Sequence, residues 1–452
     1  MPAMAPADII AAIRNAGVVG AGGAGFPTHV KLSATVDTVI ANGAECEPLL
    51  AADQAVMLLA PEKVVAGLRI AMKATGAQQG FVAVKRKHDE ALRAMREAVS
   101  LGNGIKGVAI FELDDVYPVG DEHVLVHEVT GRYVPEGGLP LEVGVVVSNV
   151  ATLANVADAV EGRPVTSRLV TVSGAVARPL TARFPIGTPV AAAIELAGGP
   201  VVERYRIIMG GPVMGKLAPD ASGVITKLTA GIIVLPADHP LVKMREDELK
   251  VILKRARAAC CQCMSCTETC PRHLLGHRIS PHLIMRAMSM SLGAPPEAIT
   301  SAWLCSECGV CAIVGCPAGL APVRVNQALK QSMAGKGIKN PYHNSDILAH
   351  PMRGSRRVHS SRLAMRAGIA PYAGHYAPGM ELFIPDRVDI PLLQHVGAPA
   401  VPRVRPGDEV MEGDLVADIP EGKIGARVHA SISGVVSQVS GVITIVAGRG
   451  RR

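Results

Sequence analysis

Nine of the ten cysteines in this chain of 452 residues lie between Cys260 and Cys316, in two short runs. The first run, CCQCMSCTETCP, contains the spacing C-x2-C-x2-C-x3-C-P, which is typical of bacterial iron–sulfur ligation. The second run, CSECGVCAIVGCP, repeats the triplet and closes after four residues instead of three. Without an export signal at the start of the chain, such clustered thiols indicate metal ligation rather than disulfides.

Three thiolates on a tight loop can face three corners of one cubane, whereas the fourth is better placed for a neighbouring cluster, as in two-cluster ferredoxins. We therefore expect two 4Fe-4S centres that exchange their fourth ligands. The first set is Cys260, Cys263, Cys266 and Cys316, and the second set is Cys305, Cys308, Cys311 and Cys270. Paired zinc sites are the alternative, which the triplet-plus-proline pattern does not favour. Cys261 is left over, either as a free thiol or as a replacement for Cys260.

The remaining composition excludes several classes of function. No apolar run approaches the roughly 18 residues of a membrane span, so we expect no transmembrane segment. The first twenty residues lack the basic start and continuous apolar stretch of a signal peptide, which predicts a cytoplasmic protein. The net charge of +7 is spread along the chain without an aromatic-interleaved basic stripe, so nucleic-acid binding is not expected.

A glycine-rich stretch near the start, GVVGAGGAGFPTHVK, matches the dinucleotide pattern G-x-G-x-x-G through Gly20, Gly22 and Gly25. That pattern indicates a Rossmann loop only between a strand and a helix. Here a helical pattern ending at Gly17 precedes the glycines, and Phe26 with the following proline continues as a loop. We expect a cradle of backbone N–H groups for a phosphate or flat ligand, with a plain turn as the alternative.

Hydrophobic periodicity around this loop predicts an α/β domain. A strand is expected at residues 38–43, a long helix at 51–75, a second strand at 80–85 and a charged helix at 88–99. This alternation favours a parallel sheet with crossover helices and a cofactor crevice at the strand ends.

The segments GAGGAGFPTHVK and ANGAECEP resemble the flavin-binding region shared by the NADH-oxidising subunit of respiratory complex I and the C subunit of the Rnf complex. The resemblance implies FMN, reduced by NADH, with no separate catalytic side chain. The matching flavin positions are Gly20, Gly22, Gly23, Gly25, Lys31, Asn42 and Glu45, while Phe26 matches the aromatic that stacks on the nicotinamide nucleotide and Glu47 matches the NADH-side acid.

A second segment, YPVGDEHV, and the later SNVATLANV resemble the rest of that flavin site. The matching positions are Gly120, Asp121, Glu122, Asn149 and Thr152. Three residues depart from the family pattern: Ala44 replaces an Asp of the complex I subunits, Asp121 replaces a Glu, and Ser148 replaces an Asn. These departures affect the tuning of the flavin and the preference for NADH.

The rest of the chain divides into further modules. Short strands from about 168 to 236 resemble the β-grasp module called SLBB, in which MGGPVMG is either a ligand loop or a pair of tight turns. The histidine-rich stretch from 340 to 385 lacks ligand spacing and indicates a partly ordered linker or surface wrap. The last seventy residues resemble a barrel-sandwich hybrid of the lipoyl and biotinyl type, although Lys423 lacks the flanking methionines of a carrier lysine.

The predicted fold class is therefore a multidomain α/β protein. Its parts are a parallel-sheet FMN/NADH domain (1–165), an SLBB-like β-grasp module (166–240), a helical two-cluster ferredoxin-like segment (241–335), a linker (336–385) and a C-terminal all-β barrel-sandwich hybrid (386–452).

This order of modules resembles the cobalamin reductase family of propanediol-utilisation microcompartments. The resemblance implies NADH oxidation and single-electron transfer through two 4Fe-4S clusters to a corrinoid, reducing cob(II)alamin to cob(I)alamin. An adenosyltransferase and shell proteins of a bacterial microcompartment are the implied partners. Three alternatives stay open: an Rnf-type subunit with a protein acceptor, a microcompartment NADH:acceptor oxidoreductase that recycles NAD without cobalamin, and a non-enzymatic carrier with a degenerate nucleotide pocket.

Overall fold

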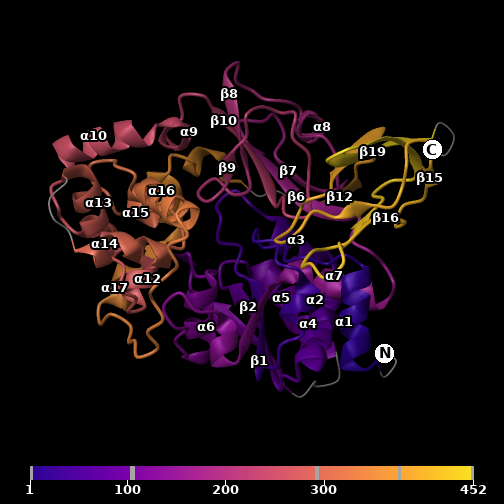
Figure 1. Cartoon of the computed structure of the whole chain (residues 1–452), viewed down its shortest axis with the longest axis horizontal. Coiled ribbons are helices and arrows are strands. Elements are labelled where there is room, and N and C mark those ends of the chain that lie inside the picture. Colours follow the sequence, from indigo (N-terminus) through magenta and orange to yellow (C-terminus); the bar gives the residue numbers. More distant parts are fainter. Residues whose placement is uncertain (1–3, 102–106, 291–294, 375–377, 449–452) are drawn as a thin grey trace.

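The computed structural model describes residues 4–101, 107–290, 295–374 and 378–448. An α/β domain at the N-terminus, a central sheet, a group of short helices that carries the cysteines and a C-terminal set of strands make up the molecule (Figure 1). The expected multidomain α/β fold class is confirmed: a parallel sheet lies in the N-terminal domain, a separate mixed sheet follows, the clustered cysteines lie in a segment of short helices, and the C-terminal module is all-β.

The N-terminal domain contains a four-stranded parallel sheet in the order β3-β2-β1-β5. Its strands are β1 (Thr38–Gly43), β2 (Gln79–Lys85), β3 (Val108–Leu113) and β5 (Val145–Asn149). Side chains of β1 alternate between two apolar clusters: Val39 and Ala41 face one cluster, and Ile40 faces the other. Both faces of the sheet are therefore covered, as is usual for a parallel sheet.

The helices of this domain include α1 (Pro6–Asn15), α2 (Thr28–Lys31), α5 (Asp89–Leu101), α6 (Glu122–Thr130) and α7 (Val150–Val160), together with the short strand β4 (Val116–Tyr117) and the 3₁₀ turn η1 (Pro140–Val143). The expected strands at 38–43 and 80–85 and the charged helix are confirmed. The carboxyl ends of β1 and β5 lie side by side, with Asn42 in register with Asn149. The flavin-type segments meet at this edge of the sheet.

The prediction of one long helix from 51 to 75 is wrong. Two helices occupy that range, α3 (Ala52–Leu59) and α4 (Pro61–Thr75), with Ala60 between them in a non-helical conformation at φ −147° and ψ 52°. Pro61 lies in the first turn of α4, where its missing N–H costs nothing, but it cannot continue α3. A Cβ on Gly67 would lie 1.8 Å from the Leu153 carbonyl oxygen, so α4 crosses α7 at a position that only glycine permits.

The central module is a six-stranded sheet in the order β12-β7-β6-β10-β8-β9. Its elements are β6 (Ser167–Gly174), β7 (Leu180–Pro185), α8 (Val190–Leu196), β8 (Tyr205–Met209), β9 (Lys216–Leu217) and β10 (Gly231–Pro236). The edge strand β12 (Pro378–Leu382) comes from almost 200 residues further along the chain and pairs in parallel with β7. The loop between β8 and β9, which contains Gly210–Gly215, projects toward the N-terminal domain, where Glu47 binds it.

The cysteine-bearing segment consists of short helices around their own apolar core. They are α9 (Pro240–Glu246), α10 (Leu249–Ala259), α11 (Ser265–Glu268), α12 (Pro271–Leu274), α13 (Pro281–Met290), α14 (Pro296–Thr300), η2 (Ser301–Leu304), α15 (Val310–Ile313) and α16 (Pro322–Gly335). Cys270, Cys311 and Cys316 are buried within this core. The thiols therefore contribute to the packing of the segment.

The histidine-rich stretch after α16 contains regular elements. They are α17 (Arg353–Arg356), β11 (Val358–His359), α18 (Ser360–Arg366) and η3 (Ala370–Tyr372). Strand β11 pairs with β4 of the N-terminal domain, and Lys85 Nζ donates to Ser360 Oγ at 3.0 Å. This stretch thus binds back onto the first module on its way to the C-terminal strands.

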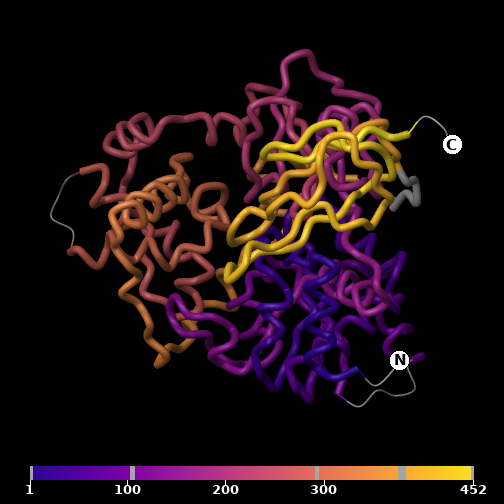
Figure 2. Tube along the Cα trace, turned by 45° about the vertical axis from the view of Figure 1, so that its right-hand side comes forward, coloured from indigo at the N-terminus to yellow at the C-terminus, as the bar shows by residue number. Residues whose placement is uncertain are grey.

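The C-terminal module consists of two small antiparallel sheets, β13-β19-β18-β15 and β14-β16-β17. Its strands are β13 (Arg387–Pro391), β14 (Val401–Pro402), β15 (Glu409–Val410), β16 (Leu415–Asp418), β17 (Val428–His429), β18 (Gly434–Val439) and β19 (Val442–Ala447). Figure 2 shows these strands alongside both the N-terminal domain and the central sheet. The backbone N–H of Val396 donates to Gly25 O at 2.9 Å, so the module contacts the glycine loop directly.

No helix in the described parts of the chain is long and apolar enough to cross a membrane.

Candidate functional site

The glycine loop is a closed turn with an exposed tip. Gly20 N donates to Phe26 O at 2.9 Å and closes the base of the loop. Gly25 is buried at φ +69°, and a Cβ there would meet Leu228 at 2.9 Å, so this glycine serves the contact with neighbouring modules. Gly22 and Gly23 are exposed at the tip, and a Cβ on Gly23 would meet nothing within 4 Å. The tip therefore leaves its backbone open to a ligand.

The tip lies beside the N-terminus of α7. Asn149 caps that helix by accepting from Ala151 N at 2.9 Å, and a Cβ on Gly22 would lie 3.6 Å from the Asn149 Cβ. Thr152 Oγ1, within the first turn, accepts from Ala21 N at 2.8 Å. A helix N-terminus next to exposed backbone attracts anions, so this arrangement fits the phosphate of an FMN. The structure thus brings Gly22, Asn149 and Thr152 together, as the sequence predicts.

Lys31 and Phe26 flank the same loop. Lys31 Nζ contacts Glu122 Oε1 at 3.0 Å, and both side chains are partly exposed. Phe26 is 37% exposed, although it is a large apolar side chain. Since neither group is buried against the protein, both are accessible to a bound nucleotide.

The carboxylate of Glu45, which lies just after β1, accepts hydrogen bonds from the backbone at the start of α3. Glu45 Oε2 accepts from the N–H groups of Asp53 and Gln54 at 2.6 and 3.0 Å, at the start of α3. Burial, and then the neighbouring Asp53 carboxylate, raise the pKa of Glu45 well above its ordinary value. Asn42 donates to Gly120 O at 3.0 Å, which ties β1 to the second flavin-type segment.

Glu47 binds the loop of the central module. Its carboxylate accepts from the N–H groups of Val213 and Met214 at 2.8 and 3.0 Å. A Cβ on Gly211 would lie 2.2 Å from Glu47, so the MGGPVMG stretch needs a glycine at this contact. Burial raises the pKa of Glu47, although the two N–H donors oppose that change.

Asp121 contacts the cysteine-bearing segment. Its Oδ1 caps α6 by accepting from His123 N at 3.1 Å, and its Oδ2 pairs with Arg272 at 2.9 Å. Burial by itself raises the pKa of Asp121, but the Arg272 guanidinium, His123 and the Val124 N–H together lower it below its ordinary value. Arg272 is two residues after Cys270, so this ion pair fastens the flavin-type segment to a cysteine loop.

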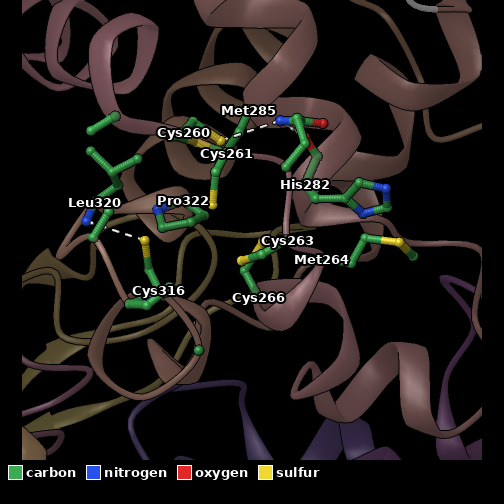
Figure 3. Close-up of a pocket in the computed structure, with 15 residues that line it drawn as sticks. Cys260, Cys261, Cys263, Met264, Cys266, His282, Met285, Cys316, Leu320 and Pro322 are labelled. Carbon is green, nitrogen blue, oxygen red and sulfur yellow. Dashed lines mark hydrogen bonds between the residues drawn. The ribbon is translucent and has the colours of Figure 1, made fainter.

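The eight expected cysteine ligands line two separate pockets. The first set lines one pocket and the second set lines the other, with Cys270 and Cys316 exchanged between the two runs. Cys261 also lines the first pocket and is exposed. Figure 3 shows Cys260, Cys263, Cys266 and Cys316 around one space, with the hydrogen bond from Leu320 N to Cys316 Sγ at its edge. No group of three or more His, Cys, Asp or Glu in the described residues is gathered closely enough for a single metal ion.

The two triplets have the same backbone shape. Gln262 and Glu307 occupy equivalent positions and lie at φ +57° and +61°, and Met264 and Gly309 follow at φ +65° and +75°. Left-handed residues at these positions turn backbone N–H groups toward the inside of a loop. Glu307 N approaches Cys305 Sγ at 3.4 Å in this way. The departure in the second run, its extra residue before Cys316, leaves the triplet geometry intact.

The thiols raise one another's proton affinity. Burial, followed by the thiols of Cys316, Cys260 and Cys263, raises the pKa of Cys266 to about 12. Burial likewise raises the pKa of Cys270 to about 12. Iron removes this cost because the cation takes the place of the protons, so two four-thiol sets around pockets fit iron–sulfur clusters.

Tyr117 joins the flavin-type region to the second cysteine set. Its hydroxyl lies 2.8 Å from the Cys308 carbonyl oxygen and 3.2 Å from Glu47 Oε1. Burial, and then the Glu47 carboxylate, raise the pKa of Tyr117 well above its usual range, so the hydroxyl stays a donor. Tyr117, Val213 and Cys308 share one apolar cluster, in which the three modules meet.

Sequence reasoning missed three residues at these contacts: Tyr117, Arg272 and Arg168. Arg168 is buried and donates to Ala21 O at 2.6 Å and to Lys227 O. It therefore ties the glycine loop to the segment around Lys227. Tyr117 belongs to the quoted YPVGDEHV segment, and a large aromatic next to matched flavin positions was a usable signal. For Arg168 and Arg272 no local pattern indicates the partner.

Family models match four parts of the chain. They are the Nuo51 FMN-binding domain over residues 13–158, the SLBB domain over 169–217, the 4Fe-4S dicluster domain over 259–321 and the RnfC barrel sandwich hybrid domain over 365–449. With the geometry above, these matches define a flavin- and iron–sulfur-dependent oxidoreductase that transfers electrons.

Almost the whole chain also matches curated relatives. It is 43% identical over 96% of both chains to "Cobalamin reductase PduS" of Citrobacter freundii, and 44% identical over 96% of both chains to the protein of that name from Salmonella typhimurium. The C subunit of the Na(+)-translocating ferredoxin:NAD(+) oxidoreductase complex of Acetobacterium woodii is 38% identical over 58% of this chain and 57% of its own length. This chain belongs to the cobalamin reductase PduS family.

Proposed function

We propose that this protein oxidises NADH and passes the electrons one at a time to a corrinoid, reducing cob(II)alamin to cob(I)alamin. The observation that carries the proposal is the contact of Tyr117 with both Glu47 and the Cys308 carbonyl, because it couples the flavin-type region to a cysteine set. The corrinoid acceptor is supported by the printed name of relatives that match 96% of the chain. FMN would divide a hydride into single electrons, and two 4Fe-4S clusters would carry them.

The residues that would hold FMN are those predicted from the sequence. The exposed tip at Gly22 and Gly23 would admit the cofactor, and the N-terminus of α7 would face its phosphate. Lys31 would add a positive charge to the same anion site. To do so, its ammonium group would leave Glu122 and pair with the bound anion. Phe26 would stack on the nicotinamide nucleotide, Glu45 would border the flavin, and Glu47 would be the acid on the NADH side, each acid held by its backbone contacts.

The burial of the cysteines supports an order for the two centres. Cys270, Cys308 and Cys311 of the second set are buried, and Cys308 contacts Tyr117. In the first set Cys263 is exposed, and Met264 beside it is 43% exposed. The second centre would therefore receive electrons from the flavin side, and the first centre would deliver them to an acceptor at the surface.

An anaerobic assay tests this function. Purified protein, reconstituted with FMN, iron and sulfide, would be mixed with NADH and offered cob(II)alamin, ferredoxin or ferricyanide in parallel. We expect the flavin absorbance to bleach and cob(I)alamin to form. Absence of bleaching by NADH would refute the enzyme function altogether. Reduction of ferredoxin without reduction of cob(II)alamin would assign a protein acceptor instead, as in an Rnf-type subunit, and transfer to ferricyanide alone would leave only an NADH:acceptor activity.

The same proposal includes where the protein acts in the cell and to which protein it delivers its product. A product as reactive as cob(I)alamin favours direct delivery to an adenosyltransferase, inside a bacterial microcompartment with shell proteins. Co-purification of the tagged protein with an adenosyltransferase from the native host would support this setting, and its free diffusion apart from shell proteins would contradict it.

A further inference from the structure

Asn326 is a buried polar side chain without a protein partner. It lies on α16, has no exposed surface, and lines the pocket of the second cysteine set. Among the described residues no group forms a hydrogen bond with its Nδ2 or its Oδ1. Buried amides almost always have partners because an unpaired one loses its hydration without compensation. The missing partner is therefore expected in the pocket itself.

The helix is held firmly against this cysteine loop. One turn beyond Asn326, Lys330 Nζ donates to Glu307 Oε1 at 2.6 Å and to Cys305 O at 3.1 Å. Gln327 Nε2 donates to the other oxygen of Glu307 at 3.2 Å. These contacts fix the register of α16, so the Asn326 amide cannot turn away to water.

The amide lines the same pocket as Cys305, the first cysteine of the second triplet. The first set has a comparable donor, since Gln262 Nε2 lies 3.2 Å from Cys260 Sγ. Gln262, however, also donates to His282 O at 3.2 Å and is partly exposed, whereas Asn326 has no hydrogen-bond partner in the described part of the chain and no access to solvent.

We infer that Asn326 is a positioning residue that donates an N–H to a sulfur of the second centre and raises its reduction potential. Reduction adds negative charge to the cluster and its sulfurs, so a hydrogen-bond donor stabilises the reduced state more than the oxidised state. The donor is fixed and shielded from water, which makes its influence larger than that of the partly exposed Gln262. This inference rests on the proposed function, because it presumes a cluster in the second set.

The test is a redox titration of the reconstituted protein, followed by electron paramagnetic resonance. Asn326→Leu keeps the approximate size of the side chain and removes the donor. We expect the potential of the second centre to shift to a more negative value while that of the first centre stays unchanged. Gln331→Leu, the same type of change on an exposed position of α16, is the matched control and should shift neither potential. A variant with both centres present and a wild-type potential would overturn the inference.

A measurement on the unmodified sequence covers the case in which Asn326→Leu fails to assemble the second centre. Protein carrying ¹⁵N only in its asparagine side-chain amides should show a ¹⁵N coupling to the reduced second centre in pulsed resonance spectra. Absence of this coupling would overturn the inference, because Asn326 is the only asparagine that lines this pocket in the described chain. Wild-type protein with iron for only one cluster would instead refute the proposed function, so the two failures are distinguishable.

Discussion

The hydroxyl of Tyr117 lies 2.8 Å from the carbonyl oxygen of Cys308, across 191 residues of sequence. The same hydroxyl is 3.2 Å from Glu47, whose carboxylate also holds the loop after β8. Three modules therefore meet at one buried phenol. A hydrogen-bonded contact of this kind fixes the distance between the flavin-type region and the second cysteine set, and electron transfer depends on that distance.

Tyr117→Phe should slow electron transfer between the two cofactor regions without stopping flavin reduction. The change removes one hydroxyl, so we expect a loss of about 1 kcal/mol in the free energy of unfolding and a looser Cys308 loop. Anaerobic stopped-flow measurement should show normal bleaching of the flavin by NADH and slower bleaching of the clusters.

Tyr133→Phe is the control for this experiment, because the Tyr133 hydroxyl accepts from Ala349 N at 3.3 Å and not from a group of Glu47 or Cys308. If the clusters of the Tyr117→Phe and Tyr133→Phe variants are reduced at the same rate, the Tyr117 contact does not govern electron transfer from the flavin to the clusters.

In the proposed ligand sets, each run of cysteines supplies its fourth ligand to the centre built on the other run. This exchange predicts which centre is lost when a given cysteine is replaced. Cys316 lines the pocket of Cys260, Cys263 and Cys266, although it closes the other run. Cys316→Ala should therefore damage the first centre and lower the iron content by roughly half, because one of two four-iron clusters is lost. Resonance spectra at low temperature and iron analysis measure both effects.

Cys261→Ala is the matched control and should keep both centres, although Cys261 borders the same pocket. Loss of the second centre in Cys316→Ala, with the first intact, would contradict the exchange. Loss of iron in Cys261→Ala would show that the ligand register is shifted by one residue.

Local patterns predicted the elements and the residue types of the site, but not the contacts between modules. Period-two strands such as β1 and the cysteine spacing depend on neighbours in sequence, so they can be read directly. The break between α3 and α4 was also readable, since Pro61 marks it. Glu47 looked like a nucleotide-side acid, but whether its carboxylate faces a ligand or the N–H groups of Val213 and Met214 depends on docking between distant modules.

The stretch from 340 to 385 illustrates the same limit. Its His, Arg, Pro and Gly content indicates a partly ordered linker or surface wrap, but not that β11 pairs with β4 or that the buried Lys85 donates to Ser360. Arg353 and Arg357 both bind Glu128 on α6. Short elements of this kind are stabilised by the surface that receives them, not by their own periodicity, so composition alone does not reveal them.

Lys31→Ala should weaken the retention of FMN. In the structure Lys31 Nζ lies 3.0 Å from Glu122, beside the glycine loop, where it can reach an anionic group. A hydrogen bond to a charged partner contributes about 1.5–3 kcal/mol, so we expect the Kd for FMN to rise by roughly tenfold to hundredfold. Fluorescence titration of the apo-flavin protein measures this change.

Lys63→Ala is a suitable comparison for the flavin titration, because Lys63 forms a similar partly exposed pair with Asp158 at 2.8 Å. Its FMN affinity should match that of the wild type. Equal affinity in Lys31→Ala and wild type would remove Lys31 from the flavin site.

Lys227 should make stability depend on pH in the alkaline range. Its ammonium group is buried between modules, where it donates to Gly17 O and Arg427 O at 2.7 Å each, and burial lowers its pKa from 10.5 to about 7. Between pH 7 and 10.5 the unfolded chain binds more protons at this lysine than the folded chain does. The free energy of unfolding should therefore rise with pH across that window, and below pH 7 the folded state carries the full cost of a buried charge.

Lys227→Met removes this titration while keeping an unbranched side chain, so the difference in urea midpoint between wild type and variant should change steadily from pH 7 to 9.5 in favour of the wild type. The nearby His429 does not interfere, because burial and then the Lys227 charge lower its pKa to about 3, and it stays neutral throughout. A difference that is constant with pH would show that Lys227 keeps its proton in the folded protein, with the two carbonyl oxygens compensating for its burial.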